Sequence, residues 1–139
     1  MIILDTNVLS ALMLDEPHAA VAEWIDRQAR TSVWTTTVTI FEIRYGLAVM
    51  PAGRRMDRIS AFDRVIAETL DNRILAFDQG AAEEAATLMA GRQQSGRASE
   101  WRDIMIAGIA LAQRATLATR NLRHFDDLTV PVINPWEIE

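Results

Sequence analysis

The chain has 139 residues, of which 50% are hydrophobic and 24% charged, and its formal net charge is −5. These values suit one globular domain covering residues 1–139, and the absence of cysteine excludes disulfides and zinc–thiolate sites. The longest apolar runs are shorter than the roughly 18 residues of a membrane-spanning helix, and the N-terminus lacks a secretory pattern, so we expect a cytoplasmic protein without a membrane anchor.

The sequence pattern predicts five short strands separated by helices. Asp78 and Ser99 are expected to be helix N-caps, and Pro17 is expected in the first turn of its helix. The strands alternate with helices in a way that is typical of an α/β fold, with three layers (α/β/α) around a central, mostly parallel sheet of four to five strands. In chain order the elements are strand 2–5, helices 7–14 and 17–30, strand 33–36, helices 39–50 and 54–70, strand 74–77, helices 78–94 and 100–115, and strands 116–119 and 130–136.

Three acidic residues are predicted to converge at one edge of the sheet. Ligands of open parallel sheets bind beyond the carboxyl ends of the strands. Asp5 ends the first strand, Glu42 lies about one turn into the helix after the second strand, and Asp103 lies early in the helix before the fourth strand. We therefore interpret these acids as one constellation.

Each acid also has a purely structural explanation. Asp5 would cap the following helix, Glu42 would pair with Arg44 on an exposed helix face, and Asp103 would favour the positive end of its helix dipole. Asp103 shares its helix face with an apolar stripe, however, so its carboxylate needs a partner. A metal ion is one such partner.

Oxygen ligands favour Mg²⁺ or Mn²⁺ over zinc at this constellation. Such an ion activates water for hydrolysis of a phosphodiester. The two histidines, His18 and His124, are interpreted as surface residues, because nothing near either of them in the sequence looks like a catalytic partner.

The charge pattern leaves a nucleic-acid partner open. A negative net charge argues against phosphate binding, but all 14 cations are arginine, whose planar guanidinium matches phosphate well. Local arginine groups at 54–58, 97–102 and 120–123 suit either phosphate contacts or solvated helix faces.

Five sequence blocks resemble, in order, the PIN-domain family of ribonucleases: ILDTNVLSAL, IFEIRYGLAVMPAGRR, WRDIMIAGIALA, LATRNLRHF and VINPW. The stretch RYGLAVMPAGRR is most similar to the FitB branch of the VapC-type toxins, which belong to type II toxin-antitoxin systems. The resemblance implies a PIN fold and Mg²⁺-dependent endoribonuclease activity on RNA, with Mn²⁺ as the other suitable ion. It also implies a homodimer and inhibition by a small antitoxin, whose DNA-binding domain supplies any contact with operator DNA.

The resemblance also assigns roles to residues. Asp5, Glu42 and Asp103 match the three principal acidic positions of the family's metal site. Asn121 matches a fourth position, where a neutral amide is a weaker metal ligand than a carboxylate, and Asp126 or Asp127 is expected to substitute for it. The supporting residues of Asp5 are expected to be Thr6 and Asn7, and those that contact RNA or the antitoxin are expected to be Phe41, Arg44, Tyr45 and Arg120.

A second function stays open at this point. The neutral Asn121 is compatible with a catalytically weak PIN-like module that acts by binding antitoxin, RNA or an operator complex. Helix 39–50 carries more large apolar residues than can all be buried at one edge of a small core. They include Phe41, Tyr45, Leu47 and Met50. Such a surplus favours a groove for a partner helix.

Overall fold

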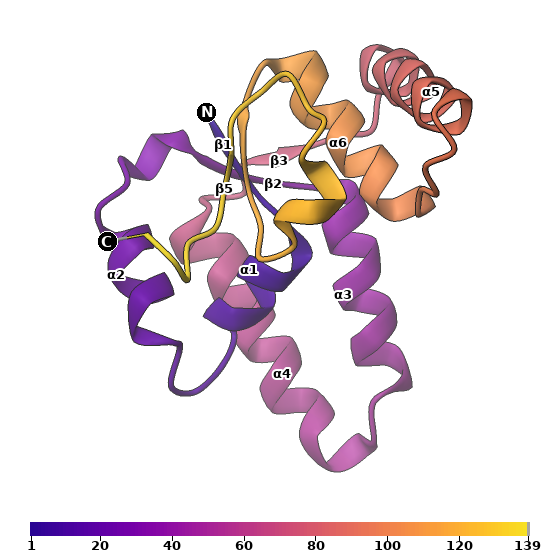
Figure 1. Ribbon diagram of the computed structural model, residues 1–139. Coiled ribbons are helices and arrows are strands. Elements are labelled where there is room, and N and C mark those ends of the chain that lie inside the picture. The colour runs from indigo at the N-terminus through magenta and orange to yellow at the C-terminus, as the bar shows by residue number, and fades with distance from the viewer. Residues whose placement is uncertain (139) are drawn as a thin grey trace.

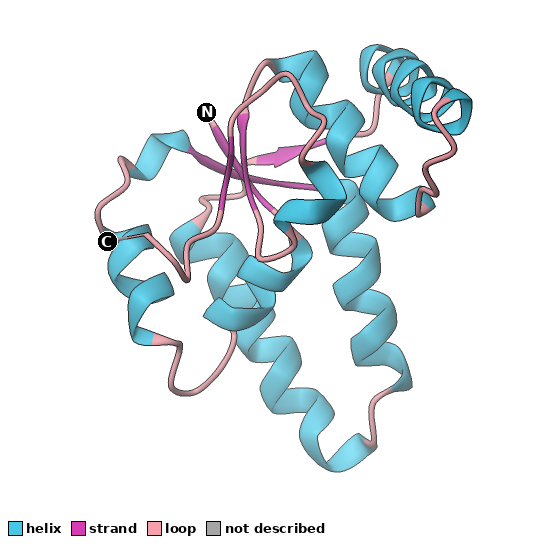
Figure 2. Ribbon diagram, viewed as in Figure 1, coloured by secondary structure: helices cyan, strands magenta, loops and turns pink. Residues whose placement is uncertain are grey.

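Five short strands form one parallel sheet at the centre of the protein (Figures 1 and 2). The computed structural model describes residues 1–138. The strand order is β3-β2-β1-β4-β5, and all neighbouring strands are parallel. Because β2 and β4 flank β1, the carboxyl ends of these three strands meet at one edge. The strands are β1 Ile2–Leu4, β2 Val33–Thr36, β3 Ile74–Leu75, β4 Thr116–Ala118 and β5 Val132–Ile133.

Helices cover both faces of the sheet (Figure 1). Helices α1, α2 and α4 lie on one side, α5 and α6 lie on the other, and α3 pairs with α4 in a hairpin that projects from the sheet. Among residues 1–138, no helix has both the length and the apolar character needed to cross a membrane. The helices are α1 Thr6–Leu12, α2 Ala19–Asp26, α3 Thr37–Val49, α4 Ala52–Arg64, α5 Gln79–Gln94 and α6 Trp101–Gln113.

The two faces of the sheet have separate hydrophobic cores. Successive side chains of a strand point to opposite faces, and the central strands follow this rule. Leu4 and Ala118 belong to the core shared with α1, α2 and α4, whereas Ile3 and Leu117 belong to the core under α6. The predicted three-layer α/β/α architecture is therefore confirmed.

The predicted strands and helices are all present, although their ends differ by a few residues. Asp78 caps α5, accepting a hydrogen bond from the N–H of Ala81 at 2.9 Å as predicted. The prediction for Ser99 is wrong, because the N-cap of α6 is Glu100, and the buried Ser99 hydroxyl has no hydrogen-bond partner in the part of the chain that the structure describes. Pro17 lies before α2 and not in its first turn, since His18 is the N-cap.

Close packing of α5 against α6 depends on a glycine, and we expect Gly108→Ala to destabilise the fold. A Cβ at Gly108 would lie 2.7 Å from the Cβ of Ala85 and closer still to the carbonyl oxygen of Ala81. Overpacking of this kind costs about 1–3 kcal/mol. Urea denaturation measures the loss of unfolding free energy.

Gly91→Ala is the matched control, because a Cβ at Gly91 in α5 would meet nothing within 4 Å. Alanine is a better helix former than glycine by roughly 0.5–1 kcal/mol, so this variant is expected to gain stability. Equal effects of the two substitutions would show that α5 and α6 do not pack as described.

Candidate functional site

Asp5 is held rigidly at the end of the central strand β1. Its side chain is buried, with 4% of the residue exposed. One carboxylate oxygen accepts the backbone N–H of Thr6 at 2.8 Å, which caps α1. The other accepts the hydroxyl of Thr119 at 2.7 Å and the amide of Asn7 at 3.3 Å. The helix-cap interpretation of Asp5 is therefore correct, and it leaves room for a second role because a carboxylate has about four acceptor positions.

Glu42 lies beside Asp5 and is joined to it through Thr6. It occupies the second turn of α3, and its Oε1 accepts the hydroxyl of Thr6 at 2.8 Å. Its Oε2 lies 3.5 Å from Nη1 of Arg102. The second nitrogen of the same guanidinium, Nη2, lies 2.9 Å from the carboxylate of Glu100. Glu42 therefore has one neutral and one cationic partner.

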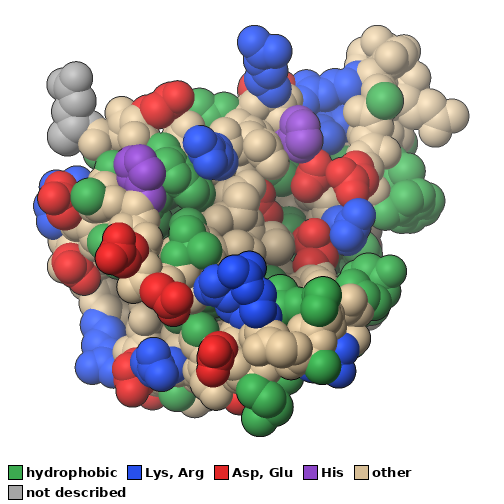
Figure 3. Space-filling view, turned by 90° about the horizontal axis from the view of Figure 1, so that it is seen from below, with side chains coloured by type: hydrophobic (Ala, Val, Ile, Leu, Met, Phe, Trp, Pro, Cys, Tyr) green, Lys and Arg blue, Asp and Glu red, His purple; other side chains and the backbone are tan. Residues whose placement is uncertain are grey.

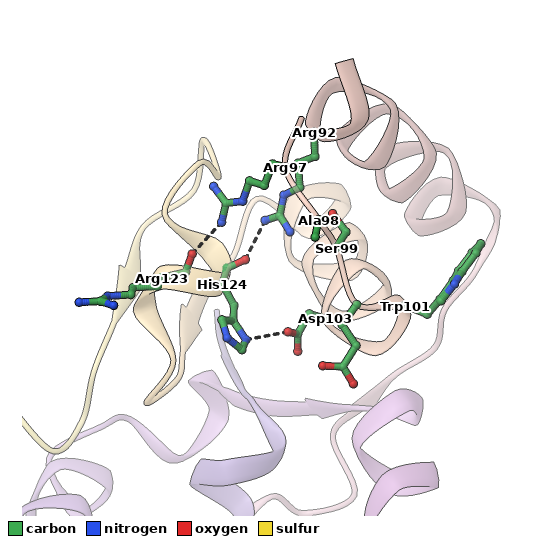
Figure 4. A pocket seen from close by; sticks show the side chains of 9 residues that line it. Arg92, Arg97, Ala98, Ser99, Trp101, Asp103, Arg123 and His124 are labelled. Atoms are coloured by element: carbon green, nitrogen blue, oxygen red, sulfur yellow. Dashed lines mark hydrogen bonds and ion pairs between the residues drawn. The ribbon is translucent and has the colours of Figure 1, made fainter. Parts of the chain in front are cut away.

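Asp103 lies in the first turn of α6 and faces His124 across a pocket (Figure 4). The Oδ2 atom of Asp103 is 2.8 Å from Nδ1 of His124. The pocket has a volume of about 590 Å³, and its wall includes the arginines Arg92, Arg97 and Arg123. His124 is a surface residue as predicted, with a side chain that is 52% exposed. The expectation that it has no potential catalytic partner is wrong, since it directly contacts Asp103.

The three acids share one electrostatic environment. Burial is the largest effect, and it raises the pKa of each carboxyl group, Asp5, Glu42 and Asp103. Repulsion adds to this effect, because the charge of Asp103 raises the pKa of Asp5, and both charges raise the pKa of Glu42. Hydrogen bonds from Thr119 and Thr6 oppose the shifts in part.

A divalent cation suits this set of oxygen ligands and would relieve their repulsion. Within the described part of the chain, however, no three acidic or histidine side chains are already gathered around one point as metal ligands. In the structure Arg102 lies against Glu42 and His124 contacts Asp103. The three acids fit a divalent cation by residue type and charge.

The expected fourth position of the site is the neutral Asn121. Asn121 follows β4, beside the edge that carries Asp5. The carboxylate of Asp127 accepts two hydrogen bonds from the buried Arg92, at 2.7 and 2.8 Å, and Asp126 lies 2.6 Å from Arg97. Both acids are held in ion pairs by arginines, and their substitution for an acid at position 121 stays a prediction.

Helix α3 leaves aromatic side chains on the surface. Phe41 and Tyr45 are 65% and 60% exposed, whereas Leu47 is buried in the core and Met50 packs against it. The predicted surplus of apolar residues is therefore correct for the two aromatic residues and wrong for Leu47. Between α1 and α3 runs a groove of about 360 Å³, with Glu42 at its polar end.

Arginines lie around the acidic residues at the surface (Figure 3). Arg44 pairs with Asp63 at 3.0 Å, so the predicted alternative of a pair with Glu42 is wrong. The exposed Arg120 stacks on Trp136, with its guanidinium carbon 5.0 Å from the ring centroid. Contacts of Arg44 and Arg120 with RNA or an antitoxin stay predictions.

Three residues of the site were missed from the sequence: Thr119, Arg102 and His124. Thr119 carries a visible signal, because it ends the TLAT strand as Asp5 ends the first strand. Arg102 and His124 carry none, since their contacts with Glu42 and Asp103 depend on how α3, α6 and the 3-10 turn Leu122–Phe125 pack.

We expect Thr119→Val to weaken metal binding without disrupting the sheet. Valine keeps the shape of threonine at position 119, directly after β4, but loses the hydroxyl that donates to Asp5 at 2.7 Å. Loss of a partner that orients a metal ligand lowers metal affinity by roughly 10–100-fold. Isothermal titration with Mn²⁺ measures the change, and Thr116→Val, in β4 and with no hydrogen bond to Asp5, is the control. Equal affinities for the two variants would exclude this role.

Comparison with known proteins places the chain in a family. The PIN domain family model matches residues 2–130, and the chain therefore belongs to the PIN domain family. The chain is 41% identical to plasmid stability protein StbB of Pseudomonas syringae pv. tomato, over 99% of each chain. It is 39% identical to VapC ribonuclease Y4jK of Sinorhizobium fredii, again over 99% of each.

A solved structure agrees with these relatives. FitAB bound to an IR36 DNA fragment contains a chain with 31% sequence identity and a TM-score of 0.89, and the match covers 100% of this chain and 98% of that one. The resemblance to VapC-type and FitB-like PIN domains is thus confirmed. The similarity covers the full set of elements that carry Asp5, Glu42 and Asp103.

Proposed function

We propose that this protein is a Mg²⁺-dependent endoribonuclease and the toxin of a toxin-antitoxin pair. The observation that carries this proposal is the group of three mutually repelling carboxylates, Asp5, Glu42 and Asp103, at one edge of a PIN fold. A relative that is 39% identical over nearly its whole length bears the name VapC ribonuclease, which supports the same activity.

Each residue of the site has a task in this proposal. Asp5, Glu42 and Asp103 would hold Mg²⁺ or Mn²⁺, which when bound lowers the pKa of water and offsets the charge of the phosphodiester. Thr119 and Asn7 fix the carboxylate of Asp5. No cysteine is present, and nothing in the site suggests a covalent intermediate, so water is the nucleophile.

The proposed partner is a small antitoxin with a DNA-binding domain. The related structure of FitAB bound to a DNA fragment supports this assignment. Exposed Phe41 and Tyr45 and the groove between α1 and α3 offer an apolar surface for an antitoxin helix. Operator DNA would be contacted through the antitoxin. We also propose a cytoplasmic location and a homodimer that forms elsewhere on the α/β body.

The test is cleavage of single-stranded RNA by purified protein. Attack by water should give 5′-phosphate and 3′-hydroxyl ends, activity should require Mg²⁺ or Mn²⁺, and EDTA should remove it. Products with 2′,3′-cyclic phosphate that persist in EDTA would rule out this chemistry.

One observation favours a second function. Asn121 is neutral, and the two acids nearest in sequence are bound by arginines, so the site has fewer anionic ligands than four acids would supply. A catalytically weak module would act instead through binding of antitoxin, RNA or an operator complex. Growth arrest on expression that disappears with Asp5→Asn would favour the ribonuclease, whereas antitoxin binding without metal-dependent cleavage would favour the module.

A further inference from the structure

Arg102 is a cation built into the acidic site by the chain itself. Its guanidinium lies 3.5 Å from Glu42 and 2.9 Å from Glu100, and its side chain is 47% exposed. It directly precedes Asp103 in the first turn of α6. Of the two acids that Arg102 contacts, Glu42 is a proposed metal ligand and Glu100 is not. Arg102 therefore differs from an arginine that forms only surface ion pairs.

The position of Arg102 also gives it access to a ligand. It lines the groove between α1 and α3 together with Thr6 and Glu42. Its neighbours Trp101 and Asp103 line the pocket on the other side, in which His124 lies. A chain-like ligand that extends from the groove to the pocket would therefore pass over Arg102. Among residues 1–138, its polar contacts are with the side chains of Glu42 and Glu100, and none is with the backbone.

The charges of the site explain what Arg102 can do. A phosphodiester is repelled by Asp5, Glu42 and Asp103, so its approach needs cations at the same place. A guanidinium forms two parallel hydrogen bonds with phosphate oxygens as readily as with a carboxylate. Once a metal neutralises Glu42, the pairing of Arg102 with that carboxylate weakens, and the guanidinium becomes available to another anion.

We propose that Arg102 binds the phosphodiester backbone of a single-stranded RNA substrate, and that in the free protein it occupies Glu42 in competition with the metal. This inference rests on the proposed ribonuclease function and names a substrate-binding residue for it. Two opposite effects of one substitution follow: without Arg102, metal binds more tightly and RNA binds more weakly.

The first measurement is metal affinity without RNA. Arg102→Gln should raise Mn²⁺ affinity by about fivefold, because it removes a positive charge a few ångströms from the ion. The Mn²⁺ concentration that gives half of the melting-temperature increase reports this affinity. Arg102→Lys keeps the charge and should stay near the wild type. Arg64→Gln removes the same charge from an exposed position on α4 and should have no effect.

The second measurement is RNA binding in the cleavage-deficient Asp103→Asn background, with a fluorescein-labelled single-stranded oligoribonucleotide. Loss of one phosphate contact lowers the slope of log affinity against log salt by about 0.7 for a single strand. Arg102→Gln should show this decrease and Arg64→Gln should not.

Different results would reject the role of Arg102 and the ribonuclease function on which it rests. Tighter metal binding with an unchanged salt slope, or an unchanged metal affinity, would overturn the role of Arg102. If Arg102→Gln fails to fold, Arg102→Lys still tests the proposal. Lysine keeps the positive charge, so the salt dependence of RNA binding should stay the same. It cannot form the two parallel hydrogen bonds of a guanidinium, so RNA affinity should fall. A wild-type protein that neither responds to Mn²⁺ nor cleaves RNA would instead reject the ribonuclease itself.

Discussion

Asp103→Asn is expected to lower RNA cleavage by more than about 100-fold, since loss of a ligand exceeds the 10–100-fold effect of losing a residue that only orients one. The substituted amide keeps the size of the side chain and can still accept a hydrogen bond from His124, which lies 2.8 Å from Asp103. A loss of activity would therefore reflect the missing charge. Initial rates on one RNA substrate at saturating Mg²⁺ measure the effect.

The same substitution should leave the metal-free protein folded and slightly more stable at neutral pH. Burial raises the pKa of Asp103 above its ordinary value of 3.8, so its ionised form is disfavoured in the folded state. This penalty is absent below the unfolded pKa and develops as pH rises through the folded pKa. The stability advantage of Asp103→Asn should therefore disappear below about pH 4, the ordinary range for an Asp side chain.

Glu83→Gln is a suitable control for the activity measurement, because Glu83 is an exposed acid of α5 whose carboxylate accepts a hydrogen bond from Gln79. It removes one negative charge and should leave the cleavage rate unchanged. If Asp103→Asn retains wild-type rates, or if Glu83→Gln loses activity to the same extent, the acids have no specific catalytic role.

Asp127→Ala is expected to reduce the free energy of unfolding by about 3 kcal/mol, because it leaves a buried guanidinium without its counter-ion. Arg92 is only 4% exposed, and it makes hydrogen bonds of 2.7 and 2.8 Å with Asp127. It also donates to the carbonyl oxygen of His124 at 2.7 Å. Loss of Asp127 should therefore also loosen the turn that holds His124 near Asp103. Urea denaturation at pH 7 measures the loss.

The pH dependence of this effect has the opposite sign to that of Asp103→Asn. The hydrogen bonds of Arg92 hold the pKa of Asp127 below its ordinary value of 3.8. Stability from this group is present above the unfolded pKa and is lost as pH falls through the folded pKa. The difference between wild type and Asp127→Ala should be constant near neutral pH and shrink below about pH 4.

Asp63→Ala provides the control for an exposed ion pair. The pair of Arg44 with Asp63 has side chains that are 51% and 58% exposed, and such pairs contribute about 0–1 kcal/mol. Similar losses for Asp63→Ala and Asp127→Ala would contradict the buried character of the Arg92 pair.

Much of the fold follows from local sequence patterns. Short apolar runs such as IIL and VWTT separated by amphipathic helices predict the parallel sheet. Asp78 could be recognised as a cap because the pattern is local. Ser99 looked the same in sequence, yet α6 begins after Glu100 and the Ser99 hydroxyl is left without a partner. Local signals specify where elements occur better than how each helix starts.

The site was only partly predictable, because its contacts join distant segments. Asp5 and Thr119 are 114 residues apart, and they meet because β4 lies beside β1 in the sheet. No periodicity in the sequence gives that strand order. The contact between His124 and Asp103 depends on a short 3-10 turn, and a polar turn carries no pattern that aims its side chains. The acids could be proposed from the sequence, and so could Thr6 and Asn7, which both bond to Asp5. The partners of Glu42 and Asp103, Arg102 and His124, could not.

Whether Asp5, Glu42 and Asp103 form a metal site is shown most clearly by the melting temperature of the free protein as Mn²⁺ is added. A cation that binds only the folded state raises this temperature progressively with its free concentration, and Asp103→Asn should weaken the response. We expect a concentration-dependent increase for the wild type. An unchanged melting temperature at millimolar Mn²⁺, together with unfolding of Asp103→Asn, would show that these acids are structural.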